Sequence, residues 1–179
     1  MAKAEQDYLP KLEAAVRDAE QAEPDRAEPR YHLGRLYRAL LRFEEALATQ
    51  EAALARDTGF APSRYERVIL LLRRYHDRVD ELRGRALAEA GLRFGSGPAG
   101  DDSAARRPGL PGDEALVAAD EEAPKLLVDA AADLAAIEGK GAASGVANAQ
   151  LACARGWLLA LRSGSSVDRE RARLSLEEA

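Results

Sequence analysis

The chain has little of what builds a disulfide framework, a metal site or a β-sheet. Its 179 residues include one cysteine, Cys153, and two histidines, His32 and His76. One cysteine cannot form an internal disulfide, and neither residue type has the spacing of a metal site. Aromatic residues make up 5% of the sequence, so alanine and leucine must fill most of the core. Alternating runs of β-branched residues are also missing, which predicts an all-α protein.

Other absences concern membranes and secretion. No apolar run approaches the roughly 20 residues that cross a bilayer, and the first residues lack the apolar core of a signal peptide. Cys153 has apolar neighbours in the sequence, so we expect a buried, unreactive thiol. A lone reduced cysteine and the lack of a signal peptide together predict a cytoplasmic protein.

The charge of the chain is distributed unevenly. The net charge is −5, but residues 26–85 carry 13 basic and 9 acidic side chains, which gives +4 between two acidic flanks. The alternative to a functional basic centre is coding bias, because 22 of the 26 basic residues are arginine. The acidic total and the scarcity of lysine disfavour nucleic acid.

Apolar residues recur at helical spacing along most of the chain. We expect helices over 5–22, 28–41, 43–56, 62–75, 77–93, 114–122, 124–138, 143–162 and from about 166 to the C-terminus. Residues 94–113 contain five glycines and three prolines, which is typical of a flexible linker or loop. The sequence therefore divides into helical residues 1–93, the linker 94–113 and further helices over 114–179.

The expected helix 28–41 carries the most informative motif. Leu33, Gly34 and Tyr37 lie on it, and Ala46 and Ala53 follow on the next helix. The Arg-Tyr pair at 30–31 recurs at 64–65, 34 residues later. This arrangement resembles the tetratricopeptide repeat (TPR) family, in which each 34-residue unit is two antiparallel helices and the units stack into a solenoid.

The resemblance implies an all-α solenoid of about three helical hairpins, with the Gly/Pro-rich segment as an insertion. Gly34 has no Cβ, so we expect it to let the paired helix come close. A weaker second unit begins at Ala61, with 77–93 as its second helix. A degenerate third unit places Trp157 at the tyrosine position and ends within a helix at Ala179. The chain is then a fragment of a longer protein, or another chain covers that end in an oligomer.

Family members bind extended peptides on the concave face formed by the first helix of each unit. The resemblance implies that the exposed positions on this face are Tyr31, Arg35, Arg38, Tyr65, Ile69 and Arg73. Guanidinium groups bind carboxylates through two parallel hydrogen bonds, so this set suits an acidic peptide or a terminal carboxylate. The alternative is that the tyrosines are half-buried packing residues and the arginines a solvated face.

The sequence thus predicts a non-catalytic protein–protein interaction module, an adaptor or scaffold, that uses no cofactor and no metal. No Ser/His/Asp arrangement or phosphate loop stands out. Two alternatives remain open. One is a nucleic-acid-binding regulator that uses the arginine-rich helices, and the other is a helical accessory domain of a larger enzyme.

Overall fold

The computed structural model describes residues 2–90, 112–140 and 145–162. These residues form helices and no strand, which confirms the all-α prediction. The helices are α1 (Ala2–Ala22), α2 (Glu28–Ala39), α3 (Phe43–Arg56), α4 (Ala61–Glu89), α5 (Asp113–Ala118), α6 (Glu122–Glu138) and α7 (Asn148–Arg162). No helix within the described ranges is long and apolar enough to cross a membrane.

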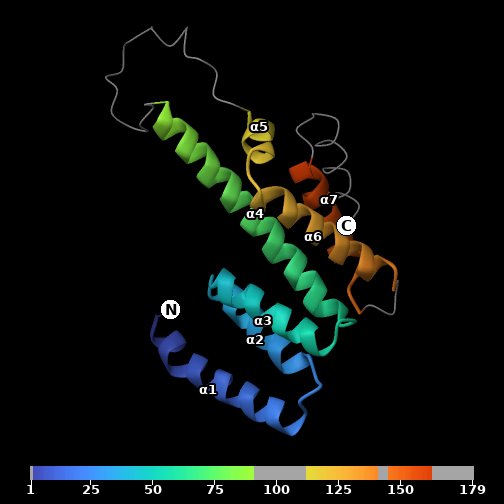
Figure 1. Cartoon of the computed structure of the whole chain (residues 1–179). Helices are drawn as coiled ribbons and strands as arrows, with labels where there is room; N and C mark the ends of the chain where they lie inside the picture. Colours follow the sequence, from blue (N-terminus) through green and yellow to red (C-terminus); the bar gives the residue numbers. More distant parts are fainter. Residues whose placement is uncertain (1, 91–111, 141–144, 163–179) are drawn as a thin grey trace.

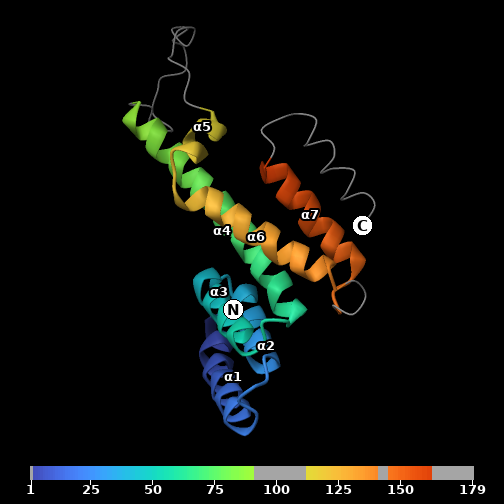
Figure 2. The ribbon, with the colours of Figure 1, turned by 45° about the vertical axis from the view of Figure 1, so that its right-hand side comes forward.

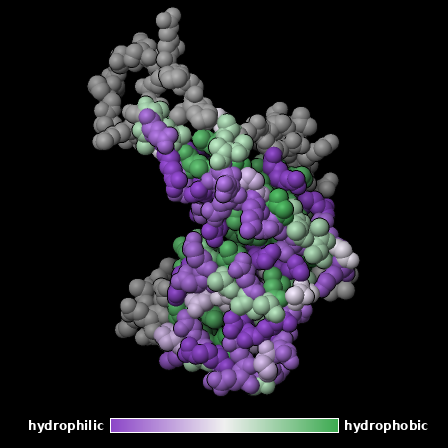
Figure 3. Space-filling view, viewed as in Figure 1, coloured by the Kyte–Doolittle hydropathy of each residue, from purple (hydrophilic) through white to green (hydrophobic). Residues whose placement is uncertain are grey.

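Helix α4 runs diagonally through the molecule, with α1 to α3 beside its first half and α5 to α7 on the other side (Figure 1). The same grouping appears after a 45° turn (Figure 2). Helices α3 and α6 both pack against α4, and α7 packs against α4 and α6. Hydrophilic residues cover much of the face shown in Figure 3, with hydrophobic residues visible between them.

Contacts between helices define their directions. Helices α2 and α4 run the same way, because Tyr31 contacts Phe60 before α4, and Arg38 pairs with Glu66 further along both. Helix α7 also runs parallel to α4. Trp157 lies in one groove with Ile69, and further along both helices the hydroxyl of Tyr75 contacts the carbonyl of Leu161.

Helix α6 is antiparallel to α4. Arg78 pairs with Asp120 before the start of α6, whereas Arg64 pairs with Asp133 near its end. Asp133 is 1% exposed and lies 2.7 Å from Arg64 Nη1 and 2.6 Å from Arg67 Nε. A buried carboxylate with two guanidinium partners fixes the register of these helices, because removing one partner would leave a buried charge uncompensated.

The expected break between helices 62–75 and 77–93 is wrong: residues 61–89 form one continuous helix. The sequence around residue 76 has neither glycine nor proline to end a helix. Ion pairs one turn apart also cross the expected break, with Arg73 bound to Asp77 and His76 against Asp80. Such pairs stabilise a continuous helix, so the hairpin expected for the second unit does not form within these residues.

Small residues let α3 approach α2 and α4 closely and let α6 approach α4 closely. Ala46 and Ala53 on α3 are fully buried, and so are Ala123 and Ala130 on α6, at the same spacing of seven residues. Helix α4 contributes a fully buried row that includes Val68 and Leu72. Alanine and leucine therefore form most of the core, as the composition predicts.

Several boundaries differ from the expectation. Helix α2 ends at Ala39, and Leu41 adopts a positive φ of 61° in the turn, where its side chain is 73% exposed rather than packed. Helix α6 starts earlier than expected because Asp120 Oδ1 accepts hydrogen bonds from the backbone N–H groups of Glu122 and Ala123. The linker, apart from residues 112–113, and the helix expected from 166 lie outside the described residues.

Gly34 lets α2 and α3 come close together, as expected. A Cβ on it would lie 2.4 Å from Gln50 Nε2 and 2.9 Å from Gln50 Cδ. Gln50 cannot easily move away, because it is fully buried and its Nε2 donates a hydrogen bond to the carbonyl of Tyr31. The amide thus ties the two helices together at the position where α2 has no side chain.

We expect Gly34→Ala to destabilise the protein by about 1–3 kcal/mol, because the added methyl displaces Gln50 from a packed interior. Gly84→Ala is the matched control. Gly84 lies in the exposed interior of α4, and a Cβ added there would have nothing within 4 Å, so alanine should stabilise by about 0.5–1 kcal/mol. Urea unfolding followed by circular dichroism measures both changes, and equal effects of the same sign would contradict this role for Gly34.

Candidate functional site

An open groove of about 640 Å³ lies between α2, α4 and α7. Its lining comes from segments far apart in the sequence: α2 and the following turn, the first residue of α3, the middle of α4, and α7. The lining residues are His32, Arg35, Leu36, Arg38, Ala39, Leu41, Phe43, Ile69, Leu70, Arg73 and Trp157. The groove thus combines guanidinium groups with apolar and aromatic surface.

Four of the residues expected at the binding face line this groove: Arg35, Arg38, Ile69 and Arg73. The structure therefore brings together side chains that the sequence places on two repeat units. They share the groove because α2 and α4 lie side by side and run in the same direction.

The two tyrosines of that set do not line the groove. The ring of Tyr31 packs edge-on against Phe60, with centroids 5.6 Å apart, and Arg35 lies over the Tyr31 ring. Tyr65 is half-buried, and burial raises the pKa of its hydroxyl, with Cys153 and Glu66 adding to the effect. Both positions match the alternative in which the tyrosines pack between helices.

Trp157 and Phe43 line the groove but were not among the expected site residues. The sequence did single out Trp157, because it falls at the tyrosine position of the degenerate third unit, but as a packing residue. Its place beside Ile69 depends on the packing of α7 against α4, which no local pattern indicates. Phe43 reaches the groove from the start of α3, where Arg73 lies 5.3 Å from its ring centroid.

Glu66, on α4, is a buried carboxylate that pairs with Arg35 and Arg38 of α2. It is 4% exposed, and Arg38 Nε lies 2.9 Å from its Oε2, while Arg35 Nε lies 3.6 Å from Oε1. Oε2 accepts no aligned hydrogen bond from the described residues. Burial raises the pKa of the Glu66 carboxyl, and Arg38 and Arg35 oppose that rise.

The groove is therefore less positive than the sequence suggests. Arg73, the third arginine, binds both carboxylate oxygens of Asp77 at 3.0 Å. Three guanidinium groups thus face two carboxylates, which leaves a small positive excess. An anionic ligand would share or replace these internal carboxylates.

No residues within the described part of the chain form a group of three or more His, Cys, Asp or Glu that could hold a metal ion. The expectation for Cys153 is wrong, because its side chain is exposed. Helix α7 turns a different face inward, where Leu151, Ala154 and Leu158 are buried.

Comparison of the chain with models of protein families, with curated proteins and with solved structures finds no match in any of the three. The observations that bear on a function of this chain are therefore the lining of the groove, its charges and the order of the helices. The sequence resemblance to TPR proteins remains a prediction.

The raised pKa of Glu66 predicts a pH dependence of stability. A carboxyl whose folded pKa is raised binds its proton more tightly in the folded state, so its charge costs stability as pH rises from the unfolded value of 4.5 through the folded pKa. Glu66→Gln removes that cost. We expect the melting temperature of Glu66→Gln relative to the parent to increase from pH 4 to pH 7.

Asp120→Asn should show the opposite trend. The hydrogen bonds from Arg78 and from the backbone N–H groups at the start of α6 lower the pKa of Asp120. Its charge therefore stabilises the fold above the unfolded pKa, and this stabilisation is lost as pH falls through the folded pKa. Scanning calorimetry tests Glu66→Gln from pH 4 to pH 7 and Asp120→Asn as the pH is lowered through and below 3.8, the unfolded pKa of Asp120. Curves for the two variants that change in the same direction relative to the parent would refute the assignment.

Proposed function

We propose that this chain is a non-catalytic protein-interaction module that binds an extended acidic segment of a partner protein in the groove between α2, α4 and α7. The observation that carries the proposal is the convergence of Arg35, Ile69 and Trp157, from three helices, on one open groove. Three parallel helices that expose side chains along one channel suit an extended ligand.

The chemistry of the lining defines the ligand. Arg35 and Arg38 offer planar guanidinium groups to a carboxylate, and Trp157 and Ile69 offer apolar surface to a neighbouring side chain. Tryptophan and arginine are the residue types most often responsible for binding energy at protein interfaces. A segment that alternates acidic and apolar residues would use both surfaces.

The order of the helices supports a repeat architecture of the TPR kind. In this proposal α2 and α3 form the first pair, α4 and α6 form the second, and α7 is the first helix of a third. The alanine pairs at 46/53 and 123/130 then occupy equivalent positions on α3 and α6. The second half of α4 then extends beyond the repeat unit, and residues 90–121 become an insertion between the two helices of the second pair.

Many arginines of α4 already pair with carboxylates of the protein, and this favours a peptide over a nucleic acid as the ligand. On α4, Arg74 pairs with Glu122, Arg78 with Asp120, and Arg85 with Glu81. Binding to a nucleic acid backbone uses a stripe of lysine and arginine side chains that are free to release its counterions. The second half of α4 instead carries a balanced network of both charges.

The groove is tested by selecting peptides from a phage-displayed random library on the immobilised protein. Selected peptides are then titrated while the fluorescence of Trp157, the only tryptophan in the sequence, is recorded. We expect acidic peptides to be enriched and to change this fluorescence on binding. Arg35→Glu with Arg38→Glu should weaken binding by at least about tenfold, since each lost charged hydrogen bond is worth about 1.5–3 kcal/mol.

Two further variants keep the test interpretable. Arg17→Glu with Arg26→Glu changes the charge equally at exposed positions outside the groove and should bind like the parent. Arg35→Gln, Arg38→Gln and Glu66→Gln together neutralise the whole cluster, so no buried carboxylate is left unpaired and the fold is preserved. If this variant binds the selected peptides as tightly as the parent, the groove is not the binding site.

A further inference from the structure

A second hollow, of about 670 Å³, lies between α4, α5, α6 and α7. We propose that it binds a small amphipathic monocarboxylate, such as a medium-chain fatty acid, with the alkyl chain inside and the carboxylate at Arg162. This site is separate from the peptide groove, and the proposal does not depend on the function proposed above.

The walls of the hollow are mainly apolar. Val79 from α4, Val117 from α5, Leu127 and Val128 from α6, and Leu161 from α7 line it. Val128 is 64% exposed, one of few large apolar side chains left open to solvent among the described residues. Sites for small ligands are typically concave, mostly apolar and between about 300 and 1,000 Å³, with a few polar groups that set the orientation.

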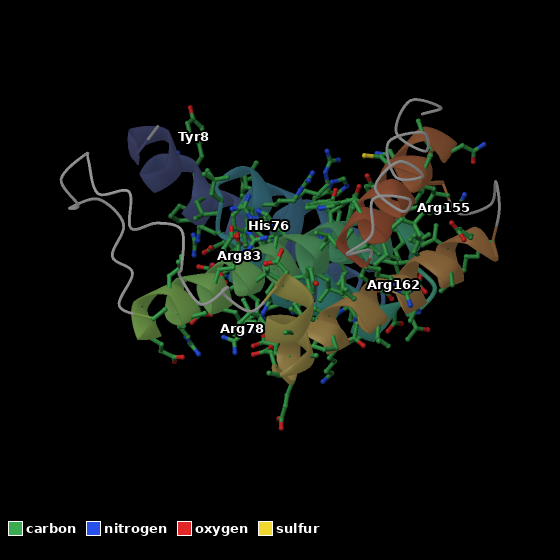
Figure 4. The ribbon with its side chains drawn as sticks, turned by 90° about the horizontal axis from the view of Figure 1, so that it is seen from above. Tyr8, His76, Arg78, Arg83, Arg155 and Arg162 are labelled. Carbon is green, nitrogen blue, oxygen red and sulfur yellow. The ribbon has the colours of Figure 1, made fainter. Side chains whose placement is uncertain are left out.

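The charged side chains at the hollow differ in whether another side chain of the protein already pairs with them. Arg83 binds Asp113 through two hydrogen bonds and also contacts Asp80, and His76 lies 3.5 Å from Asp80. Arg162, on the last turn of α7, has no ion-pair partner within the described residues. Figure 4 marks His76 and Arg83 on α4 and Arg162 on α7.

The balance of charges selects a monoanion. Arg83 and Asp113 neutralise each other, so the guanidinium of Arg162 remains as the excess positive charge of the lining. A single carboxylate would pair with it bidentately, while an apolar chain covers Val79 and Val128. A dianion would leave one charge uncompensated beside an apolar wall, which is unfavourable.

The two hollows are lined by successive turns of α7. Trp157 faces the peptide groove, and Leu161 faces this site. The hydroxyl of Tyr75 reaches the carbonyl of Leu161 at 3.5 Å and closes the space between α4 and α7 there. No residue lines both hollows, so a substitution such as Arg162→Gln changes the lining of this site alone.

The test uses 11-(dansylamino)undecanoic acid, whose fluorescence rises in an apolar environment, with the full chain at probe concentrations below micelle formation. We expect saturable binding at one site, with displacement by dodecanoate. Dodecanol and dodecylamine have the same chain without the negative charge, and both should displace the probe at least about tenfold less well.

Variants locate the site. Arg162→Gln should weaken binding of the probe by about tenfold or more, since it removes the charged partner of the carboxylate. Val128→Glu places a like charge on the exposed wall and should have a similar effect without disturbing the core. Arg155→Gln is the control, because Arg155 lies on the same helix, pairs with Glu138 and is outside the lining.

The proposal is overturned if dodecylamine displaces the probe as well as dodecanoate, or if Arg155→Gln and Arg162→Gln behave alike. It is also overturned if a short peptide with an apolar C-terminus displaces the probe better than any fatty acid, because the hollow is then a peptide site. Circular dichroism of each variant excludes unfolding as the cause of lost binding.

Discussion

Val68 and Leu72 lie one turn apart on α4, are fully buried, and form the ridge on which the other helices assemble. Helix α3 packs against this helix from one side and α6 from the other, and α7 lies against both α4 and α6. Because α4 is continuous over residues 61–89, it holds these groups in one frame. The same helix supplies Ile69 and Arg73 to the lining of the first groove. Further along, it supplies Val79 to the lining of the second hollow. The relative position of the two proposed sites thus depends on the continuity of a single helix.

The sequence predicts the fold well where the deciding residues are close together. The pair α2–α3 follows from Leu33, Gly34 and the buried alanines of α3, because Gly34 and Gln50 meet across one short turn. The sequence fails over residues 77–89, where a repeat period suggested a second hairpin and local ion pairs favour continuing the helix. The true partner of α4 is α6, which lies beyond a long intervening segment, so no local pattern could identify it. The repeat period placed Arg35 and Ile69 on one predicted face, whereas Trp157 joins them in the groove only through the packing of α7 against α4.

Charge was the property that the sequence described least well. Arginines that look free along α2 and α4 have carboxylate partners in the structure, and several of those carboxylates come from distant segments. Glu66 and Asp133 are both nearly inaccessible, yet their surroundings differ. Asp133 accepts a hydrogen bond on each oxygen, whereas Glu66 has an oxygen without one. Asp133 is therefore suited to holding helices together. Glu66 is suited to holding arginines loosely enough for a ligand carboxylate to compete for them.

Helix α7 is the wall that the two proposed sites have in common. Its buried face, with Leu151, Ala154 and Leu158, fixes it to the rest of the protein, and Arg155 pairs with Glu138 at the end of α6. Packing against α4 and α6 therefore holds α7 in place as a wall of both hollows, although none of these residues binds a ligand in either proposal. Substitutions in that packed face would alter both sites at once and would say little about either. Exposed side chains such as Val128 and Arg162 can change the chemistry of one hollow while α7 stays in place, so the function of each site is best assigned from them.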